Sequence, residues 1–241
     1  MNKVDKAIIM AAGQGTRLRP ITLTTPKPLV KVNGKAMIET AIEALKENGI
    51  HEIYIVVGYL KEQFQYLKEK YDGITILENN LYDKYNNSYS LYVARDYIEN
   101  AIILDGDQII FHKEILAPEF EKSGYNCVWV EEPTKEWLLQ VENGSVTSCS
   151  RTGGNKGWQL YSVSRWTKED GKRLKKHLEI EFDEKKNTDI FWDDVALFCY
   201  PKEYDLGIFE MKKEDIIEID TVKELIALDA SYQNLGKDLD R

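Results

Sequence analysis

The chain has 241 residues, enough for one large domain, and its 43% hydrophobic and 30% charged residues are ordinary for a globular protein. Its net charge of −9 argues against a general nucleic-acid binder, and no apolar run approaches the roughly 20 residues needed to span a bilayer. Three scattered cysteines and an N-terminus that leads directly into a strand indicate a cytoplasmic protein with reduced thiols and no signal peptide.

The first predicted element is a strand over 6–10, followed by a loop of small residues. Side chains are small or absent at Ala11, Ala12, Gly13 and Gly15. Backbone N–H groups of such a loop can approach phosphate oxygens closely, although a tight strand-to-helix turn uses the same residue types. The third glycine of a dinucleotide fingerprint and the Gly-Lys of a P-loop are both missing, so neither of these motifs accounts for the loop.

Three cationic side chains follow this loop, and one of them lies in a conformationally restricted stretch of backbone. Arg17, Arg19 and Lys27 supply positive charge suited to a triphosphate. Lys27 stands between two prolines, which restrict the local φ and ψ angles and give it a stiff mount. The loop and the lysine together predict a catalytic site that binds phosphate.

The run Ala-Ala-Gly-Gln-Gly-Thr-Arg-Leu over 11–18, with Thr-Pro-Lys-Pro-Leu over 25–29, resembles the signature of the nucleotidyltransferases that make sugar nucleotides and related activated head groups. The resemblance implies that the loop, including Thr16, wraps a nucleoside triphosphate and that Lys27 contacts phosphate. It also implies a single nucleotidyltransferase domain over 1–241, with Arg17, Lys27 and Asp107 in catalysis.

Strands and helices alternate through the first half of the chain. Apolar runs predict strands over 52–57, 74–77 and 101–104, and helical periodicity predicts helices over 36–48, 62–71 and 88–98. This alternation predicts a Rossmann-like α/β fold, a mostly parallel sheet flanked by helices on both faces. Ligands of such sheets bind at the carboxyl ends of the strands. We therefore expect the nucleotide near Gly58, Tyr59 and Asp105, with its base near Asn86, Asn87 and Ser88, where an amide can read the base edge.

Two carboxylates end the strand over 101–104, with a glycine between them. Asp105 and Asp107 suit Mg²⁺ beside a phosphate, although Asp-Gly is also a common turn. The nucleotidyltransferase resemblance favours the metal and assigns Asp107 to it, with Asp105 as support.

The second half is mixed. Strands are predicted over 125–131 and 156–165, and a hairpin over 137–150 turns at Asn143-Gly144. Helices are predicted over 167–178 and 189–198, then a strand over 215–219 and a helix over 221–232. We interpret approximately 130–200 as a small β-hairpin lid or subdomain that binds the acceptor.

The last predicted strand carries a second acidic pair. Glu218 and Asp220 point to the same side of a strand. Asp220 also precedes a helix and could serve as its N-cap. The pattern resembles the late metal motif of the same family, which implies that Asp107 and Asp220 bind Mg²⁺ together.

The later segments resemble bacterial CTP:phosphocholine cytidylyltransferases in the runs 57–64, 86–91, 136–137 and 191–193. A quaternary ammonium donates no strong hydrogen bond and is held by aromatic faces and a carboxylate. Trp137, Phe191 and Trp192 can supply faces, and Asp193 and Glu218 the charge. Aromatic residues on a helix also commonly form core, and Phe191 stands where the subfamily has tyrosine.

The resemblance thus implies transfer of CMP from CTP to phosphocholine, which gives CDP-choline and pyrophosphate with Mg²⁺. The alternatives are phosphoethanolamine or 2-aminoethylphosphonate as acceptor, a sugar-1-phosphate nucleotidyltransferase, and a non-catalytic regulatory homologue. Nucleic acid and membrane insertion are not expected, and the oligomeric state is left open.

Overall fold

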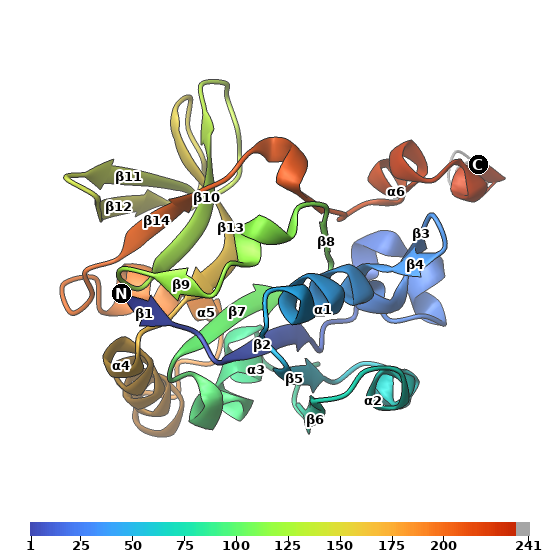
Figure 1. Ribbon diagram of the computed structural model, residues 1–241, viewed down its shortest axis with the longest axis horizontal. Coiled ribbons are helices and arrows are strands. Elements are labelled where there is room, and N and C mark those ends of the chain that lie inside the picture. The colour runs from blue at the N-terminus through green and yellow to red at the C-terminus, as the bar shows by residue number, and fades with distance from the viewer. Residues whose placement is uncertain (235–241) are drawn as a thin grey trace.

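The computed structural model describes residues 1–234, and a nine-stranded sheet forms its centre (Figure 1). The strand order is β12-β11-β13-β7-β2-β5-β6, with β10 paired to β13 and β14 paired to β10. The strands of this sheet are β2 (Lys6–Ala11), β5 (Glu52–Val57), β6 (Ile74–Glu78), β7 (Ala101–Asp105), β10 (Gly124–Val130), β11 (Leu138–Glu142), β12 (Ser145–Ser150), β13 (Gly157–Arg165) and β14 (Gly207–Glu210).

The strands β7, β2, β5 and β6 are parallel neighbours, which confirms the predicted α/β sheet. Successive residues of β2 enter two different cores because side chains alternate across a strand. Ile9 packs on the side of α1 (Met37–Glu47), and Ile8 packs on the side of α3 (Ser88–Val93) and α4 (Lys168–Glu179). Both faces are therefore covered, and the buried positions of these strands are apolar.

Four predicted helices are shorter in the structure, and one of them, 221–232, forms α6 (Val222–Leu228) and a 3₁₀ turn over Ala230–Tyr232. The segment 62–71 forms a 3₁₀ turn and α2 (Tyr66–Lys70), and 88–98 forms α3 and a 3₁₀ turn over Arg95–Tyr97. The segment 189–198 forms α5 (Trp192–Asp194) and a π turn over Val195–Cys199. The last two segments are rich in aromatic and β-branched residues, which have low helix propensity, and tertiary packing decides where each helix ends.

The antiparallel half of the sheet carries the predicted hairpin. Asn143 and Gly144 have φ angles of 51° and 76°, as a tight hairpin turn between β11 and β12 requires. Because β11 also pairs with β13, the hairpin extends the central sheet. Its role as an acceptor lid over 130–200 stays a prediction.

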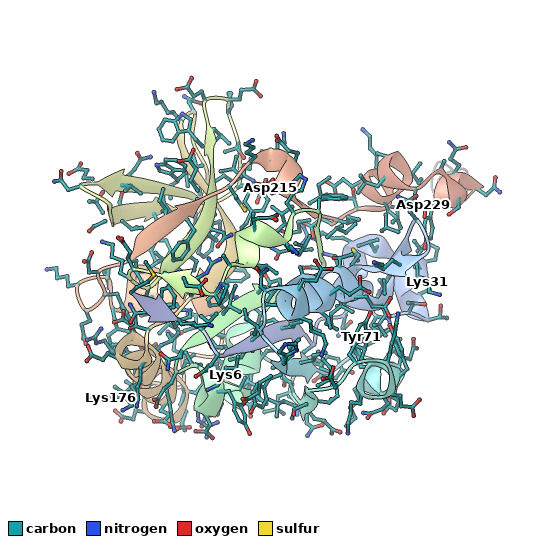
Figure 2. All side chains as sticks on the ribbon, in the orientation of Figure 1. Lys6, Lys31, Tyr71, Lys176, Asp215 and Asp229 are labelled. Atoms are coloured by element: carbon teal, nitrogen blue, oxygen red, sulfur yellow. The ribbon has the colours of Figure 1, made fainter. Side chains whose placement is uncertain are left out.

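The C-terminal segment returns to the beginning of the chain. β15 (Ile216–Glu218) pairs with β8 (Gln108–Ile110), and α6 (Val222–Leu228) packs in a small apolar cluster that includes Leu18. The hydroxyl of Tyr232 donates to the Lys31 carbonyl at 2.8 Å, and the Asp229 carboxylate accepts from the Asn33 N–H at 2.8 Å, in the region where Lys31 and Asp229 are labelled (Figure 2).

Short strands complete the structure: β1 (Asn2–Lys3) pairs with β9 (Glu119–Phe120), and β3 (Lys31–Val32) pairs with β4 (Lys35–Ala36). Among residues 1–234, no helix combines the length and the apolar character needed to cross a bilayer.

Candidate active site

Two adjoining cavities, of about 530 and 250 Å³, lie at the carboxyl ends of β2 and β7. Both are lined by Met10, Gly13, Arg17, Asp107 and Asp220. Loops at this edge of a parallel sheet meet in space, so the small-residue loop and the Asp-Gly-Asp turn share one site.

The small-residue loop is shaped around Lys27. Gly15 has a φ angle of 60°, and a Cβ built there would lie 2.7 Å from the Cβ of Lys27. Only glycine allows both this backbone conformation and this close approach. The hydroxyl of Thr22 fixes the turn by donating to the Gly15 carbonyl at 2.8 Å. The predicted loop residues that line the smaller cavity are Ala11, Gly13, Gly15 and Thr16, and those that line the larger one are Ala12 and Gly13.

Lys27 joins the two aspartates predicted to hold metal. Its Nζ donates to Asp107 Oδ2 at 2.5 Å and to Asp220 Oδ1 at 2.7 Å, and its side chain is 7% exposed. Burial by itself lowers the pKa of Lys27, but the two carboxylates outweigh burial and raise that pKa above its usual value. Arg17 Nη2 lies 2.7 Å from Asp220 Oδ1. Positive and negative groups of the site therefore neutralise one another without substrate.

The carboxylates fit a divalent cation. Single oxygens of Asp107, Glu218 and Asp220 lie within 4.8 Å of one another. Asp107 Oδ1 is also buried without a hydrogen-bond partner among the described residues. Oxygen-rich acidic sets of this kind are what Mg²⁺ binds beside phosphates.

Asp220 does not cap the last helix. Thr221 is the N-cap of α6, and its hydroxyl accepts from the Glu224 N–H at 3.3 Å. The Asp220 carboxylate is thereby left to pair with Lys27 and Arg17.

Two acids of the site have raised pKa values. Desolvation in the cavity, and then the charges of Asp107 and Asp220, raise the pKa of Glu218 to about 8, although part of its side chain is open to solvent. Burial, and then Asp107, raise the pKa of Asp105 well above its usual value. Asp105 lines the larger cavity, as expected.

One part of the lining of the larger cavity consists of amides and tyrosines. It contains Asn86 and Asn87, which were expected near the base, and four residues that the sequence pattern did not indicate: Asn79, Tyr82, Tyr85 and Ser90. Asn79 directly follows β6, so the strand-end argument could have found it.

Three residues predicted to contact the nucleotide lie outside the lining of both cavities. A Cβ on Gly58 would lie 2.7 Å from Tyr82, so this glycine makes room for a tyrosine of the lining. The Tyr59 hydroxyl donates to the Thr22 carbonyl at 2.8 Å and braces the phosphate loop. Ser88 is completely buried.

The other end of the larger cavity is aromatic and acidic. Trp137, Phe191, Asp193 and Glu218 line it as predicted, together with Glu136. The rings of Trp137 and Phe191 meet edge to face with centroids 5.8 Å apart.

Trp192 lies elsewhere than expected. It is completely buried in the core, with its ring 6.0 Å from that of Tyr125. Consecutive residues at a helix start point in different directions, so Phe191 and Trp192 cannot both face the cavity. Trp192 is therefore a core residue, as aromatic residues on a helix commonly are.

Asp193 brings a buried carboxylate to this end. The Ser162 hydroxyl donates to its Oδ2 at 3.0 Å, whereas Oδ1 has no partner within the part of the chain that the structure describes. Burial raises the pKa of Asp193 to about 8.

Comparisons with known proteins agree with this arrangement. The sequence model of the family described as "Nucleotidyl transferase" matches residues 6–124. The choline-phosphate cytidylyltransferase of Streptococcus pneumoniae is 39% identical over 229 residues, which are 95% of this chain and 99% of that protein. The 2-aminoethylphosphonate cytidylyltransferase of Lancefieldella rimae is also 39% identical, over 94% of this chain and 92% of that protein.

Solved structures give the same picture. The CTP:phosphocholine cytidylyltransferase from Streptococcus pneumoniae superposes with a TM-score of 0.88, over 95% of this chain and 99% of that one at 39% identity. The inositol-1-phosphate CTP transferase from T. maritima has a TM-score of 0.74 at 20% identity, over 98% of this chain and 96% of that one, and shares the fold.

Proposed function

Because the chain belongs to the nucleotidyl transferase family, we propose that it is a cytidylyltransferase that moves CMP from CTP to phosphocholine and releases pyrophosphate. The observation that carries this proposal is a single cavity with three parts. Its lining combines amides, the Asp107 and Asp220 carboxylates that hold Lys27, and aromatic and acidic residues.

The aromatic and acidic end suits a quaternary ammonium. Faces of Trp137 and Phe191 attract such a cation at roughly 0.5–2 kcal/mol each, and no N–H donor is needed. Glu136 adds negative charge around it, and Asp193 and Glu218, each with a pKa of about 8, add charge when they ionise. This end therefore supports choline as the head group.

The chemistry requires little of the protein beyond positioning. An oxygen of the acceptor phosphate attacks the α-phosphorus of CTP in line, and the bond to the bridging oxygen of pyrophosphate breaks. That phosphate oxygen is already anionic near neutral pH, so no general base is needed. Arg17 and Lys27 neutralise the triphosphate, and the small-residue loop supplies backbone donors.

Asp107, Asp220 and Glu218 would hold Mg²⁺, which would offset the charge between the two phosphates. Lys27 now occupies the space between two of these carboxylates. With a metal ion and CTP bound, the Lys27 ammonium would be available to pair with the triphosphate.

A second candidate acceptor is a primary ammonium, as in phosphoethanolamine or 2-aminoethylphosphonate. The unpartnered Oδ1 of Asp193 favours it, because a primary ammonium can donate a hydrogen bond there and choline cannot. A sugar phosphate is disfavoured by the aromatic lining. A non-catalytic homologue is disfavoured by the assembled Lys27, Asp107 and Asp220.

Pyrophosphate release separates these candidates. The protein with Mg²⁺ and each nucleoside triphosphate is tested against phosphocholine, phosphoethanolamine, 2-aminoethylphosphonate and glucose-1-phosphate. We expect turnover with CTP and phosphocholine. Turnover only with glucose-1-phosphate would contradict the proposal.

Two substitutions assign the halves of the cavity. Lys27→Ala should lower kcat/KM for CTP by about a hundredfold or more, as loss of a transition-state charge contact does. Trp137→Ala should raise KM for phosphocholine about tenfold and leave KM for CTP nearly unchanged. Equal effects of Trp137→Ala on both substrates would count against the aromatic site.

A further inference from the structure

A buried carboxylate is linked to both aromatic residues that line the cavity, directly to Phe191 and through an arginine to Trp137. Asp194 Oδ2 accepts the backbone N–H of Phe191 at 2.9 Å. Its Oδ1 lies 2.6 Å from Arg151 Nη2, and the side chain of Asp194 is 3% exposed whereas that of Arg151 is 46% exposed. One carboxylate therefore fixes the backbone at Phe191 and anchors a surface arginine.

That arginine packs on the other wall. The Arg151 guanidinium lies 5.6 Å from the ring centroid of Trp137 and 4.0 Å from that of Phe198. Phe198 in turn meets Trp137 edge to face at 5.7 Å. The Trp137 ring is thus packed against Arg151, Phe198 and Phe191.

The ion pair joins two segments that are distant in sequence. Arg151 directly follows β12, and Trp137 directly precedes β11, so both lie at the same end of the hairpin, where Leu138 pairs with Ser150. Asp194 belongs to α5. Among the described residues that line the cavity, neither Arg151 nor Asp194 occurs, so neither contacts a ligand in it.

We propose that Arg151 and Asp194 are positioning residues that hold Trp137 and Phe191 in the orientation needed to bind the acceptor's ammonium group. This role rests on the proposed function. Attraction between a cation and a ring depends on the distance to the ring face, so a wall that can rotate binds the cation less well. The ion pair between Arg151 and the buried Asp194 restricts that rotation, because the Arg151 guanidinium packs on the Trp137 ring.

The chain offers a matched control on the same half of the sheet. Lys156 Nζ lies 5.2 Å from the Trp129 ring centroid and 3.1 Å from Glu131 Oε1. This is the same kind of contact, a cation on a tryptophan beside an acid, but Trp129 is 40% exposed and lies outside the cavity lining among the described residues.

The test compares Arg151→Ala, Arg151→Lys, Asp194→Asn and the control Lys156→Ala by steady-state kinetics. Arg151→Ala should raise KM for phosphocholine by about five- to tenfold, with KM for CTP and kcat within about twofold of wild type. Arg151→Lys should recover part of the loss, because the charge returns without the planar guanidinium. The double variant Arg151→Ala/Asp194→Asn should be no worse than the poorer single variant. Lys156→Ala should match wild type.

A second readout does not depend on turnover. With fluorotryptophan incorporated, the ¹⁹F resonance of Trp137, assigned by its loss in Trp137→Phe, should broaden or shift in Arg151→Ala and stay in place in Lys156→Ala. An unmoved resonance, or equal increases in KM for CTP and phosphocholine, would overturn the positioning role. If wild type transfers CMP to no tested acceptor, the proposed function fails, and the resonance alone decides whether the ion pair orients Trp137.

Discussion

Asp193 shows how much one residue's surroundings can alter its chemistry. Its carboxyl is 4% exposed and accepts one hydrogen bond, from Ser162. Its neighbour Asp194 is equally buried but meets an arginine and a backbone N–H. Two adjacent aspartates thus differ in their surroundings, because Asp193 lines the cavity and Asp194 pairs with Arg151.

The raised pKa of Asp193 predicts a pH dependence of stability. Because the pKa is about 8 in the folded protein and ~3.9 in an unfolded chain, the folded state binds the extra proton between these values. This contribution to the free energy of unfolding is complete below about pH 4 and is lost as pH rises to about 8. Asp193→Asn should therefore flatten the decline over this range, by an amount on the order of a few kcal/mol.

Urea unfolding at several pH values between 4 and 8 measures this difference. Asp205→Asn is the control, because Lys122 lowers the pKa of that exposed carboxyl and the variant should show no such flattening. Parallel curves for wild type and Asp193→Asn would contradict the assignment.

At the scale of elements, the loop after β2 and the Pro26–Pro28 segment that carries Lys27 form one unit. The loop turns at Gly15 with a positive φ angle, and Lys27 packs directly against that turn. The carbonyl of Ala12 accepts from the N–H of Tyr59 at 3.1 Å, which ties the loop to the end of β5. The position of the lysine ammonium therefore depends on backbone geometry 12 residues before it.

Gly15→Ala should disrupt this unit. The new Cβ would lie 2.7 Å from Lys27 Cβ, and a displacement of about 1 Å at a reacting group can cost about a hundredfold in rate. Gly34→Ala is the control, since Gly34 also has a positive φ angle but nothing within 4 Å of a new Cβ. It should lose only about 1 kcal/mol of stability through backbone strain.

Kinetics with CTP and urea unfolding of both variants separate the two effects. Equal kinetic losses in Gly15→Ala and Gly34→Ala would show that strain, and not the contact with Lys27, limits activity.

At the scale of the whole molecule, the fold gathers like charges that repel one another. Asp107 follows β7, and Glu218 and Asp220 come from the C-terminal segment, yet their oxygens share one small volume. With a net charge of −9, the chain as a whole offers no attraction to anionic substrates. Lys27 and Arg17 balance the acidic cluster locally when no metal is bound.

Lys27→Met should destabilise the metal-free protein and strengthen metal binding. Removing one partner of a largely buried ion pair leaves carboxylates uncompensated, and we expect a loss of about 2 kcal/mol because the aspartates are partly exposed. Mn²⁺ should then bind more tightly than in wild type, since it no longer competes with the ammonium.

Calorimetric titration with Mn²⁺ and urea unfolding with and without the ion check this expectation. Lys46→Met is the matched control, because Lys46 pairs with Asp72 at the surface, far more exposed than the Lys27 cluster. Unchanged Mn²⁺ affinity in Lys27→Met would contradict competition between lysine and metal.

Local sequence patterns are sufficient to predict most strands of the central sheet, although not β14. The predicted range 52–57 coincides with β5, and the hairpin turns at Asn143-Gly144, because apolar runs and turn residues act locally. Tertiary packing decides which aromatic residue lines the cavity, where the short helices end, and that Thr221 and not Asp220 caps α6. It alone joined Lys27 to Asp220 and Arg151 to Asp194, because these contacts lie between segments far apart in the chain and depend on how the sheet brings its edges together.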